Sequence, residues 1–140
     1  MEKHVISILV ENHSGVLSRI SGLFSRRGYN IDSLSVGETE NPSISRMTIV
    51  TKADRQMQEQ IKKQLNKLVE VIKIVELEEK DAVYRELALI KVSANQSNRA
   101  EIIEIANIFR AHIVDVSKEI LILEATGEQS KLHALTEMLE

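Results

Sequence analysis

The chain has 140 residues, enough for one ordinary domain or two very small ones, and its 43% hydrophobic and 28% charged residues are typical of a globular protein. A net charge of −3 and a pI near 5.9 give no reason to expect nucleic acid or an anionic membrane as a partner. The lack of cysteine excludes disulfides, thiolate catalysis and cysteine-ligated metals, and the N-terminus is too quickly followed by charge to be a signal peptide. No stretch approaches the roughly 20 apolar residues of a membrane span, so we expect a cytoplasmic protein.

The first half of the sequence predicts a βαββαβ unit. Apolar residues recur with a period of two in the expected strands and at i, i+3 and i+4 in the expected helices, with Gly28 ending the first helix and Asp54 capping the second. The predicted elements are a strand at 4–10, a helix at 15–27, strands at 30–39 and 44–51, a helix from 55 to 68, and a strand at 69–78.

The second half begins in the same way but predicts only βαββα. We expect strands at 84–94, 112–118 and 120–126, a helix capped by Asn98 or Ser97, and a helix at 130–139. The buried positions expected in these helices are Ile102, Ile105, Ala106, Phe109, Leu132, Leu135 and Met138. The predicted fold class is therefore α+β: two ferredoxin-like units at 1–78 and 84–140, joined by a linker at 79–83. Because the second unit lacks its last strand, we expect the chain to be trimmed from a longer one.

Two uses of this fold plan conflict with the composition, whereas a third, a small-ligand sensor, is supported by the loop described below. A metal chaperone needs thiolates, and the four histidines, His4, His13, His112 and His133, have no metal-like spacing. An RNA-recognition module needs aromatic residues on its central strands, and those strands have none. Catalysis is not indicated either, since Glu11 and Asp32 are isolated carboxylates with no nucleophile, metal cluster or phosphate loop beside them.

The stretch from Glu11 to Gly15 joins the first predicted strand to the first predicted helix. The N-terminus of a helix presents free backbone N–H groups and a positive dipole end, which together form a site for a carboxylate. Gly15 permits close approach of a ligand, and the amide of Asn12 is able both to donate and to accept. The alternative is that Asn12 or Ser14 caps the helix and Gly15 makes the turn. The pattern alone leaves both interpretations open.

Five motifs resemble one protein family along nearly the whole sequence. They are ENHSGVLSRISGLFSRRGYNIDSLSVG (11–37), SRMTIVT (45–51), QIKKQLNKLVEVIKIVEL (60–77), RELALIKV (85–92) and IFRAHIVDVS (108–117). Together they resemble the regulatory small subunit of acetolactate synthase, also called acetohydroxyacid synthase. The run GLFSRRGYNI is more specific than a general signature of the fold.

The resemblance implies an N-terminal ACT domain and a C-terminal ferredoxin-like domain. It implies a homodimeric, non-catalytic partner of a thiamine-diphosphate-dependent large subunit, which it activates and makes sensitive to feedback inhibition by valine, or by leucine or isoleucine. Thiamine diphosphate, Mg²⁺ and FAD would belong to the catalytic chain, with no cofactor in this one. A free-standing ACT-type sensor that regulates another enzyme or a transcription factor is the competing interpretation.

The resemblance also implies a location for the effector between two subunits. One subunit would provide the loop of Asn12, His13, Ser14, Gly15, Val16 and Leu17, and the other would provide Asn30 and Ile31 at the start of its second strand. Many ACT domains have Asp and Pro where this chain has Asn12 and Ser14, so the ammonium group of the effector would find no carboxylate on this loop. Arg26 and Arg27 are expected to be exposed, either as solvated charges or as contacts with the catalytic subunit.

Overall fold

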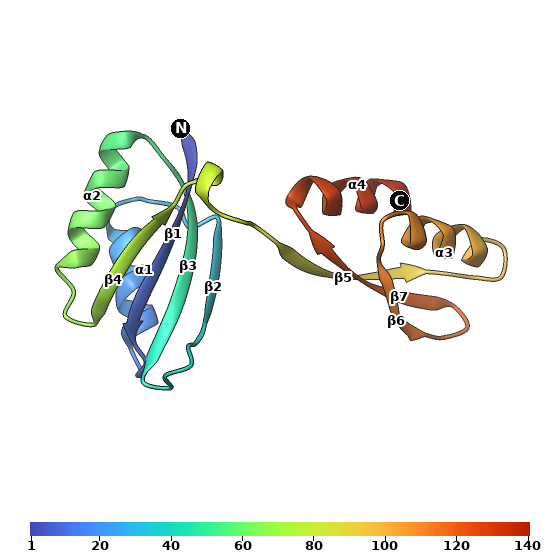
Figure 1. Cartoon of the computed structure of the whole chain (residues 1–140), viewed down its shortest axis with the longest axis horizontal. Helices are drawn as coiled ribbons and strands as arrows, with labels where there is room; N and C mark the ends of the chain where they lie inside the picture. The colour runs from blue at the N-terminus through green and yellow to red at the C-terminus, as the bar shows by residue number, and fades with distance from the viewer. The chain divides into compact units, whose positions relative to one another are not determined.

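The computed structural model describes all 140 residues, which form two compact units, Met1–Ala82 and Val83–Glu140 (Figure 1). The elements of the first unit are β1 (Glu2–Glu11), α1 (Val16–Arg26), β2 (Ser33–Glu38), β3 (Ile44–Ala53), α2 (Arg55–Asn66) and β4 (Val71–Leu77), followed by a 3₁₀ turn, η1 (Glu79–Asp81). The elements of the second unit are β5 (Glu86–Ser93), α3 (Arg99–Ile108), β6 (His112–Val116), β7 (Ile120–Gly127) and α4 (Gln129–Leu139). The predicted α+β class and the order of elements are confirmed.

The sheet of the first unit is antiparallel and has the strand order β2-β3-β1-β4. Ile6 of β1 lies opposite Ile49 of β3, and Ile8 lies opposite Met47, so one face of the two central strands is apolar. Both α1 and α2 pack on this face and bury their own apolar stripes against it. The sheet therefore has one covered face and one open face, with β2 and β4 as its edges.

The two helices of the first unit end and begin where the sequence predicts. Gly28 adopts a φ of 71°, and the amides of Gly28 and Tyr29 donate to the carbonyls of Ser25 and Phe24, which closes α1 in a Schellman motif. At the start of α2, the side chain of Asp54 accepts a hydrogen bond of 2.8 Å from the amide of Met57. Both predicted helix boundaries in this unit are confirmed.

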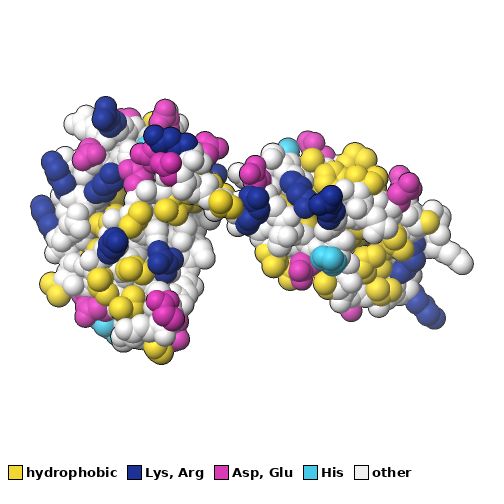
Figure 2. Space-filling model, in the orientation of Figure 1, with side chains coloured by type: hydrophobic (Ala, Val, Ile, Leu, Met, Phe, Trp, Pro, Cys, Tyr) yellow, Lys and Arg dark blue, Asp and Glu magenta, His cyan; other side chains and the backbone are white.

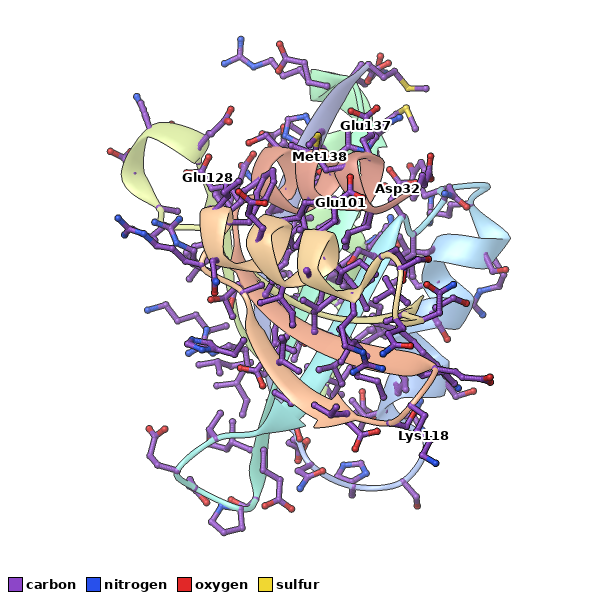
Figure 3. The ribbon with its side chains drawn as sticks, turned by 90° about the vertical axis from the view of Figure 1, so that its right-hand side faces the viewer. Asp32, Glu101, Lys118, Glu128, Glu137 and Met138 are labelled. Carbon is purple, nitrogen blue, oxygen red and sulfur yellow. The ribbon has the colours of Figure 1, made fainter.

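The second unit has a three-stranded sheet in the order β5-β7-β6, with β5 at one edge. Its core joins α3 and α4 to this sheet, and every predicted helix residue contributes to it except Met138, whose side chain is 58% exposed (labelled in Figure 3). The prediction for Met138 is wrong because the apolar contacts of α4 come from Leu132, Leu135 and Leu139. Asn98 is the N-cap of α3, as predicted, but its side chain accepts no hydrogen bond from the helix, and the side chain of Asn95 accepts from the amides of Ser97 and Asn98 in the preceding turn.

A small cluster of charged side chains connects the N-terminal end of β1 with β4 and α2. His4 Nδ1 lies 3.2 Å from Glu76 Oε1, and Lys62 Nζ lies 2.8 Å from Glu76 Oε2. Partial burial by itself would raise the pKa of Glu76, but the hydrogen bond and charge of Lys62, together with His4, outweigh it and hold this pKa below its ordinary value of 4.5. The hydrogen bond to Glu76 likewise raises the pKa of Lys62 above 10.5.

This cluster makes the stability of the first unit acid-sensitive. Because the pKa of Glu76 is lower in the folded than in the unfolded protein, its contribution is complete at neutral pH and is lost as pH falls below about 4.5 and through the folded-state pKa. We expect Glu76→Gln to lower the free energy of unfolding by about 1 kcal/mol or less at pH 7, and by less at pH 3, because the cluster is partly exposed. Urea unfolding at both pH values tests this, with the exposed Glu40→Gln as the matched control. An equal loss at both pH values would contradict it.

Candidate functional site: the loop between β1 and α1

Gly15 is the N-cap of α1, and its backbone is left-handed, with φ 89° and ψ −16°. No side chain accepts a hydrogen bond from the first turn of the helix. Asn12 and Ser14 therefore do not cap α1, so that part of the alternative interpretation is wrong, whereas Gly15 does make the turn. The side chain of Asn12 instead points across to the β2–β3 connection, where its Nδ2 donates to the carbonyl of Pro42 at 2.8 Å and lies 3.4 Å from Glu38 Oε1.

Backbone donors at this helix start are left without an acceptor in the chain. The first intrahelical hydrogen bond runs from the amide of Arg19 to the carbonyl of Gly15, and the amide of Val16 makes only a long contact of 3.5 Å with His13. The amides of Leu17 and Ser18 have no protein acceptor, and both lie at the positive end of the helix. The loop therefore presents N–H groups suited to a carboxylate.

The two apolar residues that follow Gly15 lie in different surroundings. Val16 is 4% exposed and belongs to the core of the unit, whereas Leu17 is 44% exposed. His13 is exposed, with its Nε2 3.9 Å from Glu11 Oε2. Of the predicted site residues in this loop, Leu17 is thus the one that offers an accessible apolar side chain.

Asn30 and Ile31 lie before β2, at the opposite end of α1 from the loop. Asn30 Nδ2 donates to Asp32 Oδ1 at 2.6 Å, and its carbonyl accepts from the hydroxyl of Thr51. The backbone amide of Asn12 donates to the carbonyl of Ser43, whereas Asn30 is bound to Thr51. Asn12 and Asn30 therefore lie about eight residues apart along β3, or about 26 Å. A single chain therefore does not bring the predicted site residues together.

An apolar patch that the sequence did not single out lies on edge strand β2. Leu34 and Val36 are paired with Ile49 and Met47 and so face the helix-covered side of the sheet, yet they are 40% and 45% exposed because the helices do not extend over them. We call this pair of residues the β2 patch, and Glu38 at the end of the same strand lies beside Asn12 of the loop. The alternation of Leu34 and Val36 was a strand signal, but their exposure depends on where the cover of α1 ends.

An ion pair between Arg19 and Glu70 connects the two elements that flank the loop, α1 and the end of β1. Glu70 is 8% exposed, and its carbonyl accepts from the amide of Glu11 at the end of β1, while its carboxylate contacts the guanidinium of Arg19 on α1. The pair fixes the start of α1 against the strand end that precedes the loop. Sequence reasoning missed it because Glu70 falls inside a predicted strand.

No three of the His, Asp and Glu side chains gather closely enough to hold a metal ion. No helix is long and apolar enough to cross a membrane.

Comparison with known proteins places the first unit in a defined class. Residues 6–73 match the model of the AHAS small subunit-like ACT domain, and residues 85–140 match that of the small subunit of acetolactate synthase. The first unit is thus an ACT domain, a class of regulatory module.

Relatives and a solved structure agree along nearly the whole chain. It is 59% identical to the acetolactate synthase small subunit of Mycolicibacterium smegmatis over 98% of this chain and 81% of that protein, and 56% identical to that of Mycobacterium avium over 99% and 83%. The crystal structure of the small subunit from Thermotoga maritima superposes with a TM-score of 0.94 at 44% identity, covering 99% of this chain and 87% of that one. The chain belongs to the family of acetolactate synthase small subunits, and its role is that of a regulatory subunit.

Proposed function

We propose that this subunit activates the catalytic large subunit of acetolactate synthase and makes it sensitive to feedback inhibition by a branched-chain amino acid, valine first. The observation that carries the proposal is the start of α1, where no side chain caps the helix, the amides of Leu17 and Ser18 have no acceptor in the chain, and the side chain of Leu17 is exposed. A small apolar amino acid has the matching chemistry of one carboxylate, one ammonium group and one branched side chain. Thiamine diphosphate, Mg²⁺ and FAD are assigned to the catalytic chain.

The proposed site is completed by a second copy of this chain. Asn12 lies beside Glu38 at the end of β2, whereas Asn30 and Ile31 precede its start. If β2 pairs antiparallel with β2 of a second copy, the end of one strand lies beside the start of the other, and this brings the loop of one subunit to Asn30 and Ile31 of its partner. The same pairing covers the β2 patch and the open strand edge.

The polar groups of the effector have a partner each in this arrangement. The carboxylate is held by the amides that follow Gly15, and the ammonium group by Asn12, by Asn30 of the other copy and by Glu38. Glu38 supplies the negative charge that the loop itself lacks, because its Oε1 lies 3.4 Å from Asn12 Nδ2. Leu17 and Ile31 line the pocket for the side chain.

The expected affinity follows from a few charged hydrogen bonds of about 1.5–3 kcal/mol each, set against ordering and desolvation of the ligand. For a molecule as small as valine roughly 5–7 kcal/mol remain, which corresponds to a dissociation constant between about ten and a few hundred micromolar. Inhibition follows if the catalytic subunit prefers the effector-free arrangement of the dimer, since a ligand shifts an equilibrium only by its differential affinity.

Calorimetric titration of valine, leucine and isoleucine into the purified chain tests the proposal. We expect saturable binding of valine with about one site per subunit, and weaker binding of the other two. Mixing with the catalytic subunit from the same organism should raise acetolactate formation, and valine should reverse the increase. Binding of none of the three amino acids, or a catalytic subunit whose activity stays unchanged, would contradict the proposal.

Asn30→Ala removes one cross-subunit contact of the proposed site. We expect valine to bind about tenfold more weakly, in line with the loss of one hydrogen bond to a charged group. The matched control is Asn66→Ala, an exposed asparagine at the end of α2. The same titration measures both variants, and an unchanged isotherm for Asn30→Ala would remove this residue from the site.

A further inference from the structure

A groove separates the C-terminal ends of α1 and α2, on the helical side of the first unit. Its floor is apolar and consists of Leu23, Tyr29 and Leu68. Its rim carries three cations, Arg26 and Arg27 from the end of α1 and Lys67 from the end of α2. We call this feature the basic groove.

The charge of the basic groove is not balanced within the chain. None of its three cations takes part in an ion pair, and no acidic residue lines it. The unit as a whole is neutral, with twelve Lys and Arg and twelve Asp and Glu among residues 1–82. The groove is therefore a local concentration of positive charge on a neutral unit, and Lys and Arg side chains gather over α2 in Figure 2.

The need to satisfy two helix ends does not account for these cations. The last carbonyls of α1 already accept from the amides of Gly28 and Tyr29, and those of α2 accept from Lys67 and Leu68. Basic residues near a helix C-terminus gain a few tenths of a kcal/mol from the dipole, but this effect requires no groove and no apolar floor.

The floor of the groove packs against the core of the first unit. Tyr29 packs edge-on against Phe24, with ring centroids 6.4 Å apart, and Leu68 packs against the same core. The groove lies at one end of α1, and the proposed effector loop lies at the other, about 16 Å away along an 11-residue helix. A tilt of this helix by the effector would move the groove.

We propose that the basic groove is the docking site for an acidic segment of the catalytic subunit, in which carboxylates pair with Arg26, Arg27 and Lys67 and one apolar side chain inserts over Leu23 and Tyr29. The occupant follows from charge complementarity, since an unbalanced basic rim around an apolar floor fits a segment with the opposite charge and one apolar anchor. This inference rests on the proposed function, because it assumes the catalytic partner, and it gives α1 the role of linking effector to partner.

The test is the affinity between this full-length chain and the catalytic subunit of its own organism, measured by calorimetry at two salt concentrations. We expect Arg26→Glu/Lys67→Glu to weaken association at least about tenfold and to reduce its dependence on salt. The matched control is Lys52→Glu/Arg55→Glu, which reverses two exposed and unpaired charges, one at the end of β3 and one at the start of α2. Arg27→Glu is a second, single variant, and thermal unfolding verifies that each variant is folded.

The outcomes separate this inference from the proposed function. If the wild-type chain does not bind the catalytic subunit, the proposed function fails. If it binds, and the groove variants bind equally well or the control weakens binding as much as they do, the docking site is overturned while the proposed function stands. Titration of valine into the single variant Lys67→Glu should give the wild-type isotherm, because Lys67 lies at the end of α2, outside both the effector loop and the Asn30–Ile31 segment.

Discussion

Replacing Gly15 by aspartate is expected to abolish feedback inhibition while the holoenzyme remains active. A carboxylate at this position would lie beside the amides proposed to hold the carboxylate of the effector, and two like charges at 4–5 Å repel by about 3–4 kcal/mol at an effective dielectric constant near 20. Valine binding should therefore weaken by more than about a hundredfold. The measurement is inhibition of the reconstituted enzyme by valine, with direct titration of the isolated chain beside it.

Asparagine at the same position is the matched control. The backbone of Gly15 has a φ of 89°, which strains any side chain, but no atom lies within 4 Å of an added Cβ. Asn and Asp tolerate this conformation best among the other residues and have nearly the same size, so the two variants differ in charge and share the strain. Gly15→Asn should retain measurable valine binding. An Asp variant with wild-type sensitivity would show that this loop does not hold the carboxylate.

Replacing Val36 by aspartate is expected to dissociate the proposed homodimer and to remove valine binding with it. Val36 belongs to the β2 patch, which the antiparallel pairing of two β2 strands would bury, and an unpaired charge at such an interface costs about 2–5 kcal/mol. Sedimentation equilibrium should find a monomer at concentrations where the wild-type chain is a dimer. Binding of valine should fall together with the dimer, because the partner contributes Asn30 and Ile31 to the proposed site.

The other edge of the same sheet offers the control. Ile72 lies on β4 and is 52% exposed, so Ile72→Asp introduces the same charge at an equally accessible apolar position on the edge away from β2. This variant should remain a dimer and bind valine normally. If Ile72→Asp dissociates the dimer and Val36→Asp does not, then β4 rather than β2 forms the interface.

Sequence patterns predicted the order of elements because each helix carries a continuous apolar face and each central strand alternates. They failed where the hydrogen-bond partner or the burial of a residue depends on the three-dimensional structure around it. Asn95, Ser97 and Asn98 are all good capping residues, and only the path of the chain decides that the side chain of Asn95 accepts two backbone hydrogen bonds in the turn before α3. Met138 continues the period of α4, but the helix packs through Leu132, Leu135 and Leu139 and leaves Met138 exposed.

The candidate site was predictable only in part for the same reason. The glycine and the polar residues at the first strand-to-helix junction located the loop, since these residue types are chemically distinctive. The sequence did not reveal that Glu38 approaches Asn12, because 26 residues separate them. Nor did it reveal the exposure of Leu34 and Val36, which is set by the extent of the covering helix.

The two units place a similar loop at the start of their first helix, and the loops treat their amide groups differently. In the second unit the amides of Asn95, Ser97, Asn98 and Arg99 all donate within the loop itself, so its order is fixed when the unit folds. In the loop of the first unit the amides of His13, Ser14 and Gly15 have no acceptor within the chain. Amide hydrogens of the second loop should exchange slowly with or without an effector, whereas the exchange rate of those in the first loop can change when an effector binds. One of the two repeated loops is therefore permanently structured, and the other can respond to a ligand.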